Sequence, residues 1–209
     1  MKKIQIITLL MPLMISCSSM PEQTIELEQQ PKSNSVSFNK IDRSFYNACF
    51  IGEKKSVKIE IDYYNSKISS SGSSLLFPVY ITNNSGEELL LDPSKVKLYI
   101  TLVKHPYDSR QLQYFDMPER VQSGQSIMFG AGYVFNDENE KLGVEITRVF
   151  FNNYIDGLNN NNDSSSAAKQ KLAKANADIK KNLKFWNGKL EIRESQLIIP
   201  LNFKIIEPY

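Results

Sequence analysis

Apolar residues recur at every second position in several short runs of this chain, and this alternation constrains the fold more than any other feature. In the run VKIEIDY, residues 57–63, Val57, Ile59 and Ile61 alternate with charged residues. Successive side chains of a β-strand point to opposite faces of a sheet, so the run predicts a strand with one buried face. Similar alternation occurs at residues 75–81, 96–102, 127–135 and 197–205.

Turn-forming residues separate these runs. Examples are NNSGEE at residues 83–88 and DPSK at residues 92–95. The segment NDENEKLG, residues 136–143, is interpreted in the same way, as a hairpin turn that leads into a strand VEITRVFF at residues 144–151. Short strands separated by turns predict a mainly β fold, an antiparallel β-sandwich.

Prolines and glycines inside the alternating runs indicate local irregularities. Pro78 and Pro200 cannot donate a backbone N–H to a neighbouring strand, so we expect an edge strand or a bulge at each. Gly130 and Gly132 lie on the face opposite the apolar residues of their run. Glycine at such positions indicates a bulge or the close approach of another backbone.

One segment departs from the alternation. Residues 165–186 combine strong helix formers with apolar residues at three- and four-residue steps. This spacing predicts one Lys-rich α-helix, inserted in or appended to the sandwich, with an apolar stripe on one side. Its lysines, among them Lys174 and Lys181, form either a solvated face or a contact with an anionic surface.

The N-terminus divides the chain into three parts. Residues 1–16 have a charged start, a short apolar stretch and the small residue Ser16, which together indicate a signal peptide. The apolar stretch is far shorter than the ~20 residues that a membrane-spanning helix needs. Residues 17–43 have the polar composition of a flexible tether. Residues 44–209 are then expected to form the β-sandwich domain, including the helix.

The end of the signal carries a recognisable motif. Met14-Ile15-Ser16-Cys17 resembles the lipobox of bacterial lipoproteins. This resemblance implies that Cys17 becomes lipidated and, after cleavage, the new N-terminus of a membrane-anchored protein. Ser18 resembles the sorting signal that directs such lipoproteins to the outer membrane of bacteria with two membranes, on its periplasmic or surface face. The alternative is an ordinary secretory signal in which the cysteine is incidental.

The stretch from Leu76 to Phe135 resembles the small immunoglobulin-like domains of bacterial lipoproteins. The portion YITNNSGEELLLDPSKVKLYI, residues 80–100, carries most of this resemblance. It implies an immunoglobulin-like sandwich, although the Cys…Trp…Cys pattern of true immunoglobulin domains is absent. If Cys17 is acylated, Cys49 has no partner in the chain, and we expect a buried, inert thiol there.

Charge and residue inventory exclude several classes of function. Removal of Lys2 and Lys3 lowers Lys+Arg from 25 to 23, which equals the 23 Asp+Glu. A nearly neutral chain gives no reason to expect a nucleic acid as partner. His105 is the only histidine, so no metal site or cofactor is expected and any Ser-His-Asp arrangement would depend on this one residue.

Pairs of acidic residues are the one kind of catalytic site that the sequence leaves open. Asp116 and Glu119 share a long loop, and Asp137 and Glu138 share a turn. Two carboxylates across a sugar can hydrolyse a glycosidic bond, so an envelope glycan hydrolase is one alternative function. A lipoprotein that binds a sugar or another small ligand within the sandwich is a second.

A cluster of aromatic residues supports the main hypothesis. The loop at about residues 104–125 contains residue types that are enriched in protein-binding hot spots. The residues in question are Tyr107, Arg110, Tyr114, Phe115 and Met117. We therefore expect a non-enzymatic accessory or assembly component of the cell envelope, anchored in the membrane by lipid, that contacts an envelope protein through this loop, through the basic helix, or through both.

Overall fold

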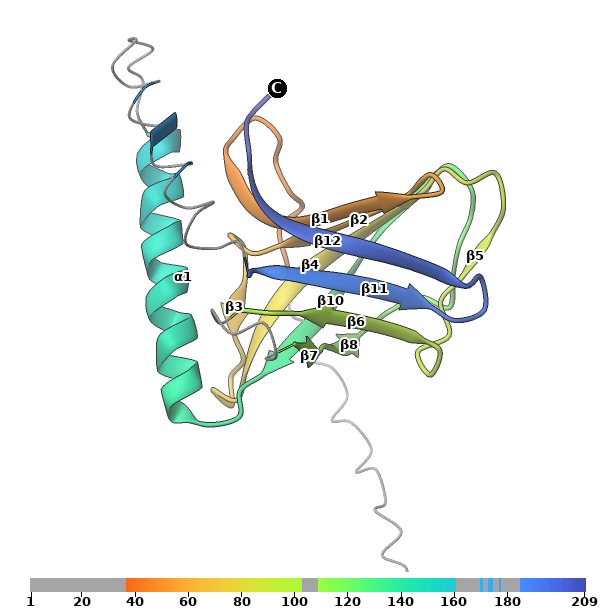
Figure 1. The fold of residues 1–209 in the computed structure, drawn as a ribbon, viewed down its shortest axis with the longest axis horizontal. Helices are drawn as coiled ribbons and strands as arrows, with labels where there is room; N and C mark the ends of the chain where they lie inside the picture. The colour runs from red at the N-terminus through yellow and green to blue at the C-terminus, as the bar shows by residue number, and fades with distance from the viewer. Residues whose placement is uncertain (1–36, 103–108, 161–169, 171–172, 175–176, 178–184) are drawn as a thin grey trace, which may run out of the picture. The chain divides into compact units, whose positions relative to one another are not determined.

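The computed structural model describes residues 37–102, 109–160, 170, 173–174, 177 and 185–209. The chain divides into two compact units, Met1–Ser35 and Val36–Tyr209, and the first lies outside the described residues. The second unit is mainly β, an antiparallel sandwich accompanied by a helix (Figure 1), which confirms the predicted fold class.

The strands belong to one large sheet and one small sheet. The large sheet has the order β7-β6-β11-β12-β1-β2-β4-β10-β8, with the short β3 beside β4, and its pairs are antiparallel. Its members are β1 (Asn47–Lys54), β2 (Val57–Asp62), β3 (Lys67–Ile68), β4 (Ser74–Asn83), β6 (Val96–Ile100), β7 (Arg110–Gln111), β8 (Gln113–Phe115), β10 (Gln125–Val134), β11 (Asn187–Ile192) and β12 (Leu197–Ile206). The small sheet pairs β5 (Leu89–Leu90) with β9 (Arg120–Val121).

The two ends of the large sheet meet. The terminal strands β7 and β8 are separated in the chain by Leu112 alone, so the sheet must curl until its ends are neighbours. The Leu112 N–H donates to the carbonyl oxygen of Leu98 in β6 at 2.7 Å. The sandwich is therefore a single curved sheet that is almost closed on itself.

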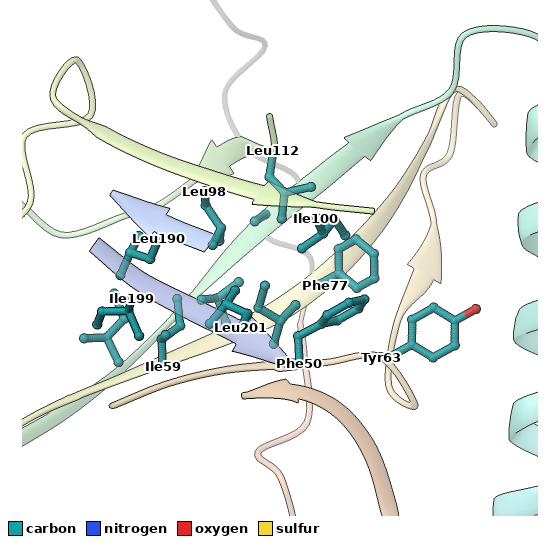
Figure 2. Packing of buried hydrophobic residues seen from close by; sticks show 14 of the residues in the cluster. Phe50, Ile59, Tyr63, Phe77, Leu98, Ile100, Leu112, Leu190, Ile199 and Leu201 are labelled. Carbon is teal, nitrogen blue, oxygen red and sulfur yellow. The ribbon is translucent and has the colours of Figure 1, made fainter. Parts of the chain in front are cut away.

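The alternating residues of the sequence fill the interior of this curved sheet. Figure 2 shows the close packing of buried side chains from β1, β2, β4, β6, β11 and β12. Among them are Phe50, Ile59, Phe77, Leu98, Ile100, Leu190, Ile199 and Leu201. The inward faces predicted for residues 57–63, 75–81 and 96–102 are confirmed, because every second residue of each run is buried.

The two prolines do not mark edge strands. β4 lies between β2 and β10, and β12 lies between β1 and β11, so the edge-strand alternative is wrong at both prolines. Instead, each proline lies just beyond the end of a ladder. Pairing of β4 with β2 ends at Val79, next to Pro78. Pairing of β12 with β1 ends at Asn202, two residues from Pro200. A residue without an N–H is tolerated where the ladder to one neighbouring strand has already ended.

The segment that was interpreted as a hairpin turn and a strand is a helix. Helix α1 spans Glu138–Asn159. Asp137 is its N-cap, and its carboxylate accepts the Glu140 N–H at 2.8 Å. The buried residues Val144, Phe151 and Ile155 follow the helical period of three to four residues. The β-branched residues of VEITRVFF favoured a strand, but capping and packing decide for a helix.

The predicted Lys-rich helix at residues 165–186 falls mostly outside the described residues. Of its members, six are described: Gln170, Ala173, Lys174, Ala177, Phe185 and Trp186. The first four are helical and exposed. At its end, Trp186 is buried against Phe151 of α1, with the ring centroids 5.6 Å apart.

Residues that precede β1 also lie against the sheet. The Ile41 N–H donates to the hydroxyl of Tyr80 at 2.9 Å, and that hydroxyl donates to the carbonyl oxygen of Asn39 at 2.7 Å. Arg43 forms an ion pair with Glu60 of β2. The part of the predicted tether from Ser37 to Arg43 is thus held by contacts with the folded unit.

Candidate functional site

The predicted partner-binding residues do not share one surface. Tyr107 lies outside the described residues. Arg110 is in β7, Tyr114 and Phe115 are in β8, and Met117 is in the turn that follows. Neighbouring residues of a strand point to opposite faces, so Tyr114 and Phe115 are directed to opposite sides of the sheet. Each side chain therefore has to be considered separately.

Tyr114 and Met117 face the core. The Tyr114 hydroxyl donates to the carbonyl oxygen of Val96 at 3.1 Å, and its ring packs edge-on against Phe129 with centroids 6.1 Å apart. Burial raises the pKa of this hydroxyl, which therefore stays protonated as a donor. Met117 packs against the same core. These two residues stabilise the end of the sheet and are not available as a contact surface.

Arg110 belongs to a polar junction between β7, β10 and α1. Its guanidinium lies 3.7 Å from Oε1 of Glu140. The same carboxylate accepts the hydroxyl of Tyr133 at 2.6 Å and the N–H of Asn136 at 2.6 Å. Glu140 is therefore a helix-capping residue held by three groups, and Arg110 supplies the charge that balances it.

Phe115 is the one described aromatic of the cluster that is directed outward, and 41% of its surface is exposed. It lies over Gly130 and Gly132 of β10. A Cβ atom at Gly132 would lie 3.1 Å from Cε2 of Phe115, and one at Gly130 would lie 3.2 Å from Cε2 of Phe38. The two glycines thus leave room for two aromatic rings on the outer face, where the sequence indicated a bulge or an approaching backbone.

Other apolar residues extend this outer face. Met128 and Val134 are on the same side of β10 as the two glycines, because they alternate with them, and both are exposed. Lys67 Nζ lies 5.8 Å from the centroid of the Phe38 ring. We refer to Phe38, Phe115, Met128 and Val134 together as the Phe115 surface.

The lysines of the predicted basic helix add little to the described site. Lys174 is exposed. Lys181 lies outside the described residues.

The acidic residues considered for glycan hydrolysis have surface or capping positions. Asp137 caps α1, and Glu138 forms an exposed ion pair with Lys141 at 3.4 Å. Asp116 and Glu119 are exposed in the turn after β8. His105 lies outside the described residues. Within the described ranges, no group of three or more His, Cys, Asp or Glu side chains is placed to hold a metal ion.

Two ionisable groups are fully buried opposite each other on the paired strands β1 and β2. Cys49 of β1 pairs with Asp62 of β2, and neither is exposed. Burial raises the pKa of the Cys49 thiol, and the nearby Asp62 charge adds to this, so the thiolate nucleophile is disfavoured. Burial also raises the pKa of Asp62, although its carboxylate accepts the N–H and the Nδ2 amide of Asn65 at 3.0 and 2.6 Å. The expectation of an inert thiol is consistent with this environment.

Sequence reasoning missed an apolar surface on α1. Four side chains on the outer face of this helix are each between 51% and 61% exposed. They are Leu142, Ile146, Val149 and Phe150. The sequence contained a usable signal, since Asp137 and Glu140 have the spacing of a capping box and the apolar residues after them fit a helical period.

Among the described residues, no helix is both long and apolar enough to cross a membrane. The chain matches no protein-family model, no curated protein and no solved structure.

Proposed function

We propose that this chain is a lipid-anchored protein of the cell envelope that acts by binding another envelope protein. The lipobox-like segment Met14 to Cys17 supports the anchor, and the polar residues after it support a tether. In bacteria with two membranes, the anchor would be in the outer membrane. The observation that carries the binding role is the Phe115 surface.

The Phe115 surface has the physical properties of a protein-binding site. Its aromatic residues are partly exposed, yet they are held in place, because Phe115 packs over the glycines of a paired strand and its neighbour Tyr114 is fixed in the core. A preorganised aromatic side chain loses little conformational entropy when a partner covers it. Aromatic residues of this kind dominate binding energies in many interfaces.

The anchor is tested by changing the lipidated residue. The Cys17→Ala protein is expected to leave the membrane fraction, and the wild-type protein is expected to carry added acyl mass in intact-mass spectrometry. Acylation supplies about 0.8 kcal/mol for each buried methylene, so a multiply acylated chain is held firmly. A wild-type mature chain without acyl mass, or Cys17→Ala protein that stays in the membrane fraction, would contradict the anchor.

The binding role is tested by photo-crosslinking in cells. A photoreactive amino acid at Phe115 is expected to capture one discrete protein, whose identity mass spectrometry then gives. The matched control has the same amino acid at Lys54, an exposed residue at the end of β1. Capture of the same proteins at equal yield from both positions would contradict a partner site at the Phe115 surface.

A further inference from the structure

The outer face of α1 has a composition that a solvated helix does not have. Its exposed residues from the second turn onward are Leu142, Gly143, Ile146, Val149, Phe150, Asn153 and Gly157, and none of them is charged. An ordinary surface helix carries charged residues on the face opposite its buried stripe. This face is therefore apolar on the side where water would favour charge.

Two charged residues of α1, Arg148 and Asp156, are held against the body of the domain. Arg148 Nη1 donates to the carbonyl oxygen of Ser66 at 3.4 Å. Asp156 accepts a hydrogen bond from the hydroxyl of Tyr64. Both interactions hold α1 against the strands and keep these charges at the flanks of the helix. The four apolar side chains remain exposed on the opposite side of the helix.

The size of this face limits what can cover it. Leu142, Ile146, Val149 and Phe150 together expose on the order of 400 Å², which is the size of the largest apolar patch on a typical monomer, and such a patch is often functional. A standard dimer interface buries about 800 Å² on each partner, about twice the area of these four side chains. An apolar area of this size is sufficient for contact with a surface to which the domain is already tethered.

The N-terminal segment reaches the domain at β3, and the residue before β3 contacts α1. Lys67 Nζ donates to the carbonyl oxygen of Ser37 at 2.8 Å, and Ser66, the residue before Lys67, is the acceptor of Arg148. Ser37 is thus linked to α1 through two consecutive residues. Residues 18–36 separate it from Cys17, and a coil of that length spans about 25 Å. A lipid attached at Cys17 would keep α1 within reach of the bilayer surface.

We propose that the outer face of α1 lies on the lipid bilayer, with Leu142, Ile146, Val149 and Phe150 at the boundary between headgroups and acyl chains. This inference rests on the proposed lipid anchor, which supplies the proximity. An interfacial helix buries its apolar face about 5–10 Å into that boundary. Because this face carries no charge, the contact depends on apolar burial, and it should form equally on neutral and anionic lipid and at low and high salt.

The test uses the full lipidated protein in vesicles of phosphatidylcholine. A nitroxide label is placed at Ile146→Cys, with Leu90→Cys as the matched control, an exposed aliphatic position in β5. Figure 1 shows β5 at the end of the sheet away from α1. Cys49 is fully buried and should not react in the folded protein. Collision of the label with oxygen and with a water-soluble nickel complex then reports its depth.

The label at position 146 is expected to gain oxygen collisions and to lose nickel collisions several-fold relative to position 90. Equal nickel accessibility at the two positions would overturn the proposal. Spin–spin broadening between labels at position 146 would also overturn it, because a second copy would then cover the face. Val149→Cys repeats the measurement if the first variant does not fold. Failure of the anchor is recognised separately, by the absence of acyl mass before labelling.

Discussion

Gly52 gives the sharpest test of how the sheet curls. This glycine is buried in β1, next to the point where pairing of β1 with β12 ends at Ile51. A Cβ atom added to it would lie 2.2 Å from the carbonyl oxygen of Pro200, and 2.8 Å from side-chain atoms of Ile199 and Leu201. The nearest obstacle is backbone, so no change of rotamer can relieve it. In Gly52→Ala, β1 and β12 must move apart by about 1 Å.

The expected loss of stability depends on where in the core this movement occurs. Overpacking of a core, through off-rotamer side chains and backbone shifts, typically costs about 1–3 kcal/mol and occasionally more. β1 and β12 together contribute Phe50, Ile199 and Leu201 to the buried cluster, so their separation loosens the core as well. We expect Gly52→Ala to lower the free energy of unfolding by about 3–4 kcal/mol. For a domain of this size, the melting temperature would fall by roughly 10 °C.

The assay is equilibrium unfolding in urea, with the fluorescence of Trp186 as the readout. This is the only tryptophan of the chain, and it is buried among Phe50, Phe151 and Phe203. Gly143→Ala is the control, because nothing lies within 4 Å of its added Cβ in exposed helix. That change should raise the stability by about 1 kcal/mol. A loss below about 1 kcal/mol for Gly52→Ala would refute the close approach of β1 to β12.

Three further predictions concern single side chains. Asp137→Ala removes the N-cap of α1 and should lower the free energy of unfolding by about 1 kcal/mol, measured in urea, whereas Asp137→Asn should retain most of it. Burial raises the pKa of Asp62 in the folded protein above its ordinary value in the unfolded chain. Between these two pKa values the folded protein binds more protons than the unfolded chain, so stability should fall as the pH rises through this range. Asp62→Asn should abolish this fall, and an unchanged pH profile would contradict it. Cys49 should react with a thiol reagent only at the rate of unfolding, since it is fully buried; rapid reaction of the folded protein would show the buried environment to be wrong.

The strands could be predicted because their signal is local. In residues 57–63, apolar residues recur at every second position, and the pleat of a strand directs them to one buried face. Residues 75–81 contain the same alternation, but the intervening Leu76, Pro78 and Tyr80 are buried as well. The order of the strands could not be predicted in this way. Pairing of β1 with β12 joins opposite ends of the domain, and no property of either segment alone specifies the other as its neighbour.

Helix α1 and the binding residues show where local reasoning fails. Val144, Ile146 and Val149 have side chains that favour strands, and the alternation of Val144 and Ile146 supported that interpretation. The hydrogen bonds of Asp137 and Glu140, and the packing of Phe151 on Trp186, outweigh this preference. The aromatic loop was predicted as one cluster, but residues 114 and 115 are adjacent in a strand and therefore have opposite surroundings.

The joint between the two ends of the large sheet has a consequence for how the domain opens. Residues 110–115 form β7 at one end and β8 at the other, and Leu112 and Tyr114 bond to carbonyl oxygens of β6 across the joint. Neither end can fray without pulling on the other, because one hexapeptide belongs to both. Such a ring of ladders lacks a loose terminus from which unfolding could spread stepwise. We therefore expect β7 and β8 to open together, so that their amide protons exchange at the same rate.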